Sequence, residues 1–184
     1  MLGNLFIGFF FVSSIAQFQL RDTEGGTHTP AEWAKQKAVL LFFITTDCPV
    51  GNGYVPEMNR LREAYAARGV AFYGVQADPT VPGDVVARYA RDYRYSFPLL
   101  LDPAQILVRH ANATITPQAA ILSPDGKVVY LGPIDNRVED FGKTRPHATE
   151  AYVREVLDAI LGGRGIIFST HKSIGCSITR RTAP

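Results

Sequence analysis

The stretch that decides the fold is AVLLFFI at residues 38–44, followed directly by TTDCPVGNG at residues 45–53. A continuous apolar run of branched and aromatic residues predicts a central strand that is buried on both faces. The polar, glycine-rich segment after it predicts a loop that carries Cys48. Cys48 is therefore expected at the carboxyl end of a buried strand, the end at which open α/β sheets form their sites.

Strand and helix patterns alternate along the chain on both sides of this strand. The predicted strands are 18–22, 70–75, 97–101, 119–122 and 127–131. A short helix is predicted to start at Thr29, and four further helices are predicted at 54–69, 84–93, 102–111 and 149–161. The segment 135–146 is expected to be irregular. This order predicts an α/β domain with a largely parallel sheet, helices on both faces, and a hairpin that adds antiparallel strands at one edge.

The bulk composition excludes several classes of protein. The chain has 184 residues, 46% of them hydrophobic and 20% charged, which fits one globular domain. A net charge of +2 gives no electrostatic footprint for nucleic acid. Of the two cysteines, Cys48 and Cys176, neither belongs to a Cys-x-x-Cys or to a zinc-site cluster, so a disulfide-rich or zinc scaffold is not expected.

The chain is predicted to have three parts. Residues 1–17 read as a signal peptide, because LFIGFFFV at 5–12 precedes the small residues Ser14 and Ala16, although no Lys or Arg comes first. The apolar run is too short for a stable membrane span. Export to the periplasm or the extracellular space follows; a buried N-terminal strand in a cytoplasmic protein is the alternative. Residues 18–163 form the domain, and 164–184 a tail that carries Cys176.

Cys48 has the sequence setting of a reactive thiol. It stands between a predicted strand and a predicted helix, whose N-terminus supplies partial positive charge and free N–H groups. Both favour the thiolate, which is the nucleophile in sulfur chemistry. The alternative is an inert buried cysteine, which the surrounding polar loop makes less favoured.

Several motifs together resemble one family. They are Asp47-Cys48-Pro49 with Pro56 eight residues after the cysteine, Thr116-Pro117 ahead of a strand, Phe18-x-Leu20-x-Asp22-x-x-Gly25, Gly132-x-Ile134-Asp135 and the tail Ser173–Ile178. This set resembles peroxiredoxin-like redoxins of the thioredoxin-fold superfamily, related to the alkyl hydroperoxide reductase and thiol-specific antioxidant family. The resemblance implies a thioredoxin-like fold with a central mixed sheet. It also implies a cis-proline loop at Thr116-Pro117 that faces Cys48 and, with Pro49, contacts substrate.

The departures from the family pattern bear on the reaction. Gly51 stands where a Cys-x-x-Cys motif has its second cysteine, which excludes a local disulfide. Thr45 is correctly placed three residues before Cys48, but Leu41 stands where peroxiredoxins have a proline. Arg109 and Arg137 are candidates for the peroxiredoxin arginine, and solvated surface residues are the favoured interpretation of both. Peroxidase activity is therefore a hypothesis.

Two neighbours of Cys48 have alternative roles. The hydroxyl of Thr45 is able to donate to a thiolate or a peroxide oxygen, or else to satisfy backbone at the strand end. Asp47 would disfavour a thiolate at close range, and it is expected instead to cap the following turn.

Cys176 leaves three alternatives open. It is a resolving cysteine that condenses with oxidised Cys48, a partner of Cys48 in a permanent disulfide, or unpaired. Sequence does not place the two Cα atoms within bonding range. A soft-metal site at His171 and Cys176 is a further, less favoured reading.

Two functions are carried forward. The first is a thiol-dependent oxidoreductase, and hence an enzyme, in which Cys48 attacks a hydroperoxide or a disulfide. Cys176 or an external thiol then resolves the product, and no metal or organic cofactor is implied. Its partners are a small peroxide or a protein disulfide or thiol reductant, with no nucleic acid. The second is a non-catalytic thioredoxin-fold binding module, with Cys48 in a structural disulfide with Cys176 or holding a ligand or metal.

Overall fold

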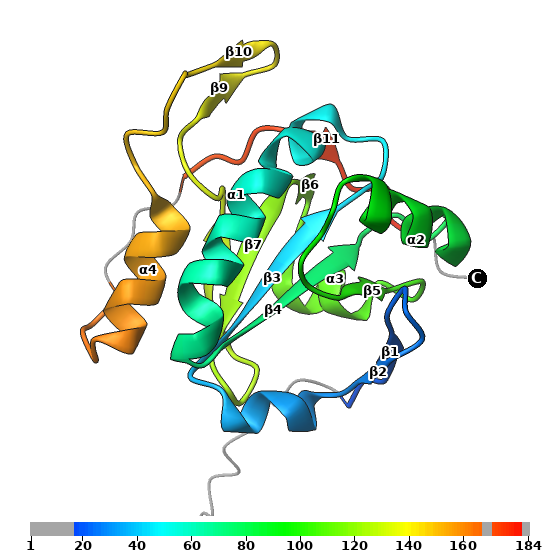
Figure 1. The fold of residues 1–184 in the computed structure, drawn as a ribbon, viewed down its shortest axis with the longest axis horizontal. Coiled ribbons are helices and arrows are strands. Elements are labelled where there is room, and N and C mark those ends of the chain that lie inside the picture. Colours follow the sequence, from blue (N-terminus) through cyan, green and yellow to red (C-terminus); the bar gives the residue numbers. More distant parts are fainter. Residues whose placement is uncertain (1–16, 167–170, 182–184) are drawn as a thin grey trace, which may run out of the picture.

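The computed structural model describes residues 17–166 and 171–181, so the predicted signal peptide falls almost wholly outside the described residues. Strands and helices alternate as expected (Figure 1). The strands are β1 Leu20–Arg21, β2 Thr27–His28, β3 Ala38–Ile44, β4 Val70–Gln76, β5 Leu99–Leu101, β6 Ile115–Thr116, β7 Gln118–Leu122, β8 Val128–Gly132, β9 Val138–Asp140, β10 Lys143–Thr144 and β11 Cys176–Ser177. The helices are α1 Pro49–Tyr65, α2 Gly83–Asp92, α3 Ile106–Ala111 and α4 Tyr152–Leu161, with 3-10 turns η1 Pro30–Lys35 and η2 Ala66–Arg68.

A five-stranded mixed sheet forms the centre, in the order β5-β4-β3-β7-β8. β3 pairs in parallel with β4, and β4 pairs in parallel with β5. β7 runs antiparallel to β3, and β8 runs antiparallel to β7. The predicted α/β fold with a mixed sheet and an antiparallel hairpin is confirmed.

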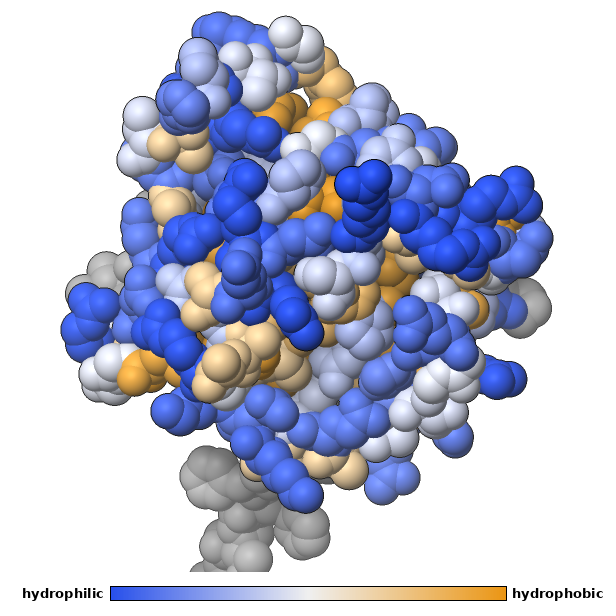
Figure 2. Space-filling model, viewed as in Figure 1, coloured by the Kyte–Doolittle hydropathy of each residue, from blue (hydrophilic) through white to orange (hydrophobic). Residues whose placement is uncertain are grey.

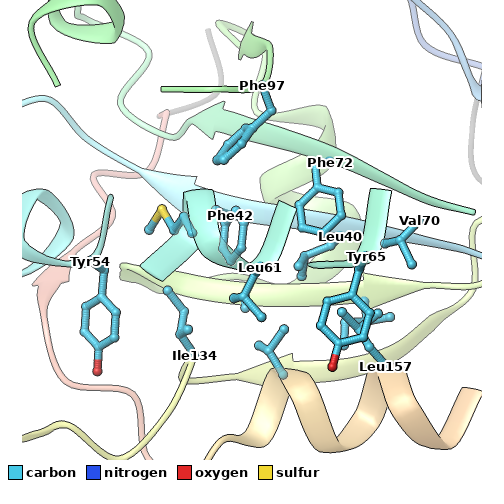
Figure 3. Close-up of a cluster of buried hydrophobic side chains, with 14 of the residues drawn as sticks. Leu40, Phe42, Tyr54, Leu61, Tyr65, Val70, Phe72, Phe97, Ile134 and Leu157 are labelled. Carbon is cyan, nitrogen blue, oxygen red and sulfur yellow. The ribbon is translucent and has the colours of Figure 1, made fainter. Parts of the chain in front are cut away.

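β3 is buried along its whole length because its side chains alternate between two cores. Ala38, Leu40, Phe42 and Ile44 belong to the core under α1, α2 and α4. Figure 3 shows Leu40 and Phe42 of β3 in the same cluster as Leu61 and Tyr65 of α1. Val39, Leu41 and Phe43 belong to the opposite core, which α3 and η1 cover. The helices therefore cover both faces of the sheet (Figure 1).

The predicted loop after β3 is shorter in the structure than the sequence indicates. α1 begins at Pro49, so the expectation of a loop through Gly53 is wrong. Proline suits the first helical position, where its missing N–H costs nothing. Cys48 itself is the N-cap residue, and the interpretation of Asp47 as the capping residue is also wrong. The reactive-thiol candidate therefore sits directly on the helix end.

Of the other local predictions, the Asp102 cap is confirmed, whereas the Thr29 cap and the irregular segment 135–146 are wrong. Thr29 makes no side-chain cap, and the segment after it is the 3-10 turn η1. Asp102 does cap α3, as its carboxylate accepts from the N–H groups of Ile106, Leu107 and Val108. The segment predicted to be irregular contains the hairpin β9–β10. The tail contributes β11, which the sequence pattern does not predict.

The molecular surface is mainly polar. Figure 2 shows hydrophilic residues over most of the face seen in Figure 1, with hydrophobic residues in small groups. Within residues 17–166 and 171–181, no helix combines the length and apolarity needed to cross a bilayer.

His28 of β2 lies between two carboxylates, those of Asp22 just after β1 and Glu32 in η1. This arrangement predicts that the stability of the fold depends on pH. His28 Nε2 lies 2.8 Å from Asp22 Oδ2, and Nδ1 lies 3.0 Å from Glu32 Oε2. Burial acts to lower the pKa of His28, but the hydrogen bonds to Asp22 and Glu32 outweigh it and raise the pKa above 6.5. Burial acts to raise the pKa of Asp22, but His28 and two backbone N–H groups hold it below 3.8.

We expect His28 and Asp22 to stabilise the fold most between about pH 4 and 6.5. The raised pKa of His28 means that its contribution is complete below 6.5 and is lost as the pH rises through the folded-state value. The lowered pKa of Asp22 means that its contribution is complete above 3.8 and is lost as the pH falls through the folded-state value. Denaturant unfolding of wild type and His28→Gln across this range is the measurement. A difference between the two proteins that does not change with pH contradicts the prediction.

Candidate functional site

Cys48 lies at the junction of β3 and α1, where the sequence places it. Its side chain has no exposed surface. The N–H of Gly51 donates to Cys48 Sγ at 3.4 Å, and the Cys48 thiol donates to the carbonyl oxygen of Thr116 at 3.0 Å. The residue that replaces the second cysteine of a Cys-x-x-Cys motif thus contributes its backbone N–H. A Cβ at Gly51 would lie 3.7 Å from Cys48 Sγ.

The Thr116–Pro117 loop packs directly against Cys48. The Thr116–Pro117 peptide bond is cis, as the resemblance implied. Pro117 is buried on the same side of Cys48 as Gly51, since its Cδ lies 4.0 Å from the Cβ position of that glycine. Pro49, by contrast, is exposed at the first position of α1. The three residues named as substrate contacts therefore surround Cys48, but only Pro49 faces solvent.

Cys176 reaches this site on strand β11. β11 pairs antiparallel with β6 so that Cys176 stands opposite Thr116 and Ser177 opposite Ile115. The Thr116 hydroxyl lies 3.4 Å from the carbonyl oxygen of Cys176, to which it donates. β6 and β11 lie side by side at the end of the sheet where α1 begins (Figure 1). Two cysteines that are 128 positions apart in sequence therefore meet through Thr116, both as free thiols.

The two thiols perturb each other's protonation. Burial acts to raise the pKa of Cys48, but hydrogen bonds from the Cys176 thiol, the Gly51 N–H and Thr116 outweigh it, so the pKa is lowered. Burial, together with the hydrogen bond to Cys48 and the charge of Cys48, raises the pKa of Cys176 to about 12. Of the two thiols, Cys48 is therefore the one that loses its proton more easily.

Thr45 contacts the Thr116 side chain and the backbone of Cys48, but not the sulfur. Its side chain is buried, and its hydroxyl lies 3.4 Å from the Thr116 hydroxyl rather than on the sulfur. Its carbonyl oxygen accepts from the Cys48 N–H at 3.4 Å. This geometry fits the positioning of Thr116 and of the backbone of Cys48.

The two arginine candidates occupy different places. Arg109 donates to the carbonyl oxygen of Ala104 at the start of α3. Arg137 donates to the carbonyl oxygen of Gly53 in α1 at 2.7 Å, and its guanidinium lies 4.5 Å from the centre of the Tyr54 ring. Arg137 is therefore packed on the first turns of α1 rather than solvated, and the main groups that lower the pKa of Cys48 are Cys176, Gly51 and Thr116.

Two tyrosines near Cys48 were not predicted as site residues. Burial and neighbouring charge, including that of Cys48, raise the pKa of Tyr89 to about 12 and raise that of Tyr95 as well. Their hydroxyls lie 3.0 Å apart, and Tyr89 also donates to Asn52 in α1. The helical spacing of Tyr89 indicated a core position, and nothing in the sequence pattern distinguished it from other core tyrosines.

The metal readings have little geometric basis. His171 stacks on the Tyr152 ring with centroids 3.9 Å apart. Across the part of the chain that the structure describes, no three His, Cys, Asp or Glu side chains converge as metal ligands would.

A strand, a capping cysteine at a helix N-terminus and a facing cis-proline loop together define a thioredoxin-fold redoxin. Residues 13–131 match the AhpC/TSA family, and the chain belongs to that family. The resemblance drawn from the motifs is confirmed.

Curated relatives and solved structures are similar to this chain over much of its length. The chain is 28% identical over 127 residues to the thiol-disulfide oxidoreductase ResA of Halalkalibacterium halodurans, covering 67% of this chain and 70% of that protein. It is 31% identical over 96 residues to ResA of Bacillus thuringiensis, where it spans about half of each chain. A hypothetical protein of Sinorhizobium meliloti 1021 superposes with a TM-score of 0.76 at 28% identity, covering 90% of this chain and 91% of that chain. An uncharacterized conserved protein of Geobacillus kaustophilus gives 0.77 at 26%, covering 94% and 93%.

Proposed function

We propose that the protein is a thiol oxidoreductase in which Cys48 is the nucleophile and Cys176 the resolving thiol. The observation that carries this proposal is the β6–β11 pairing, which holds Cys176 beside Cys48. The oxidant is a disulfide or a hydroperoxide, and the first is favoured because the curated relatives are thiol-disulfide oxidoreductases. Thr116, Pro117 and Pro49 are proposed to contact that substrate, and Thr45 to position Thr116.

The proposed reaction balances with either oxidant. The Cys48 thiolate attacks a disulfide, a mixed disulfide forms, and one thiolate leaves. With a hydroperoxide, the O–O bond breaks, Cys48 becomes a sulfenic acid, and an alcohol or water leaves after protonation. Cys176 then attacks Cys48 sulfur, and the second thiolate, or water, is released. In both cases two thiols give up two electrons to form one disulfide, and an external dithiol reduces it again.

The coupled pKa values suit this order of events. When one of the two thiols ionises, the lowered pKa of Cys48 favours the charge there, while Cys176 keeps its proton and donates a hydrogen bond. Once Cys48 is oxidised it no longer carries that charge, so part of what raises the pKa of Cys176 disappears. Cys176 thus becomes a better nucleophile only after the first step.

Oxidation of the purified protein tests this proposal. We expect two free thiols in the reduced protein, and none after one equivalent of hydrogen peroxide or of a small disulfide. Peptide mapping should then locate one intramolecular Cys48–Cys176 disulfide, which a dithiol reverses within the time of turnover. Two thiols that persist after either oxidant would contradict the proposal.

The same experiment separates the second function. A protein isolated with no free thiols, whose disulfide resists mild dithiol treatment, would be the non-catalytic module with a structural Cys48–Cys176 bond. The proximity of the two cysteines is compatible with both functions, but the lowered pKa of Cys48 favours the catalytic one.

Export also remains a proposal, supported by the apolar run at residues 5–12 and the small residues Ser14 and Ala16. The N-terminal sequence of the protein recovered from an expressing bacterium's periplasm tests it. Recovery in the cytoplasm with an intact N-terminus would overturn it.

A further inference from the structure

We propose that the tail segment 172–181 occupies the backbone edge that an extended polypeptide would need in order to reach Cys48. The docked protein therefore takes small oxidants, and polypeptide disulfides gain access only when the tail leaves. This inference rests on the proposed function and specifies its class of substrate.

The edge in question lies on the nucleophile itself. Thr116 is the last residue of β6, and its carbonyl oxygen lies 3.0 Å from Cys48 Sγ. In the described chain β6 pairs with β11 in a separate two-stranded sheet. An extended chain that brought a disulfide to Cys48 would add to this edge through its backbone groups, as strand addition generally does.

The tail already uses those backbone groups. Cys176 and Ser177 pair with Thr116 and Ile115, and the N–H of Ile178 donates to the carbonyl oxygen of Thr114 at 2.9 Å. A strand edge presents each N–H and C=O once, so a second chain cannot pair there while β11 is in place. Cys176 itself occupies the position opposite Thr116, which a substrate cysteine would take.

Contacts beyond the strand hold the tail in this position. Ile178 is only 6% exposed and lies in the core that α3 covers. The side chain of Gln105, itself 1% exposed, donates to the carbonyl oxygen of Thr179 at 2.6 Å and accepts from the N–H of Arg181 at 2.8 Å. Arg180 donates to the carbonyl oxygen of Ala113 at 2.7 Å. The tail is therefore packed as part of the domain.

Burial of Cys48 points to the size of the oxidant. Because Cys48 has no exposed surface, every substrate needs some opening of the site. A hydroperoxide or a small disulfide needs a local opening, whereas a polypeptide needs the whole β6–β11 pairing to break. The structure therefore predicts that the docked protein reacts with small oxidants and excludes extended polypeptides. For a small oxidant, Cys176 is already beside Cys48 for the second step.

Binding of a synthetic copy of the tail tests whether the edge is occupied. The probe is a fluorescent peptide of residues 172–181 with serine in place of Cys176, followed by anisotropy on the full chain. Ile178→Asp should release the tail, since it places a charge in an apolar core. Ser177→Asp is the matched control, because it adds the same charge one residue away at an exposed position. We expect the peptide to bind the Ile178→Asp protein and neither wild type nor Ser177→Asp.

This readout does not require Cys48 to be active, so it separates the tail inference from the proposed function. The inference is overturned if the peptide binds wild type as tightly as it binds Ile178→Asp, or if it binds neither protein. Gln105→Ala provides a second released form if Ile178→Asp does not fold, and circular dichroism checks both variants.

Kinetics then test the substrate class. The rate of Cys48 reaction is measured with hydrogen peroxide, a small disulfide and an extended peptide disulfide. We expect the rate with the peptide, relative to that with the small disulfide, to rise about 10-fold or more when the tail is released. The peroxide and small-disulfide arms identify which small oxidant is used. An unchanged ratio contradicts the inference, while failure of all three oxidants contradicts the proposed function instead.

Discussion

Replacement of Cys48 by serine is expected to reduce oxidant-dependent turnover to the uncatalysed rate. A serine hydroxyl at this position stays protonated at neutral pH, and the Thr116 and Gly51 contacts described for the Cys48 side chain supply no base to remove its proton. The hydrogen bonds that favour the Cys48 thiolate cannot compensate for that difference. The measurement is consumption of a dithiol with hydrogen peroxide or a small disulfide as oxidant. Turnover of Cys48→Ser at the wild-type rate would remove the proposed function.

Variants of Cys176 provide the control for this result. Cys176→Ala should still complete the first step, releasing one equivalent of product and stopping with Cys48 as a sulfenic acid or mixed disulfide. It should also raise the pKa of Cys48, because the hydrogen bond from Cys176 is the foremost contribution that lowers it. Cys176→Ser keeps a donor, so its Cys48 should titrate between those of wild type and Cys176→Ala. Alkylation rates against pH measure this order, and identical profiles for all three proteins would contradict it.

The sequence predicts the central part of this site because it depends on local patterns. The apolar run 38–44 has no polar position, so it predicts a strand buried on both faces, and the structure has β3 over the same residues. Cys48 follows that strand directly and is found at its end. The cis peptide bond before Pro117 was predicted only from the family resemblance, because neither composition nor periodicity indicates a cis bond.

The rest depends on contacts between distant segments. β11 has only two residues, too few for a periodic pattern, and exists because β6 offers an unpaired edge. Gln105 is buried and anchors the tail, and no local sequence pattern distinguishes it from an exposed polar residue. The start of α1 was misjudged because Gly51 and Gly53 indicate a loop, whereas the N-cap bond to Cys48 and packing of the helix outweigh their low helix propensity.

Gly175 explains why the tail is able to pair so closely with β6, and it predicts the second large effect. A Cβ at this position would lie 2.0 Å from the carbonyl oxygen of Thr116, which is backbone and unable to move aside cheaply. Gly175→Ala should therefore break the β6–β11 pairing and move Cys176 away from Cys48. Because small displacements of a reacting group lower rates steeply, disulfide closure should slow by about 100-fold, with the first step retained.

Gly165→Ala is the matched control for this substitution, since a Cβ there has no atom within 4 Å. Rapid-quench measurement of Cys48 oxidation and of Cys48–Cys176 closure in the same samples separates the two steps. Closure at the wild-type rate in Gly175→Ala would mean that the docked strand is not what delivers Cys176. Slow closure in Gly175→Ala with normal closure in Gly165→Ala would show that Gly175 is what allows β11 to pair closely with β6. The second thiol, which α1 lacks because it has Gly51 in place of a cysteine, would then be supplied by Cys176 on β11.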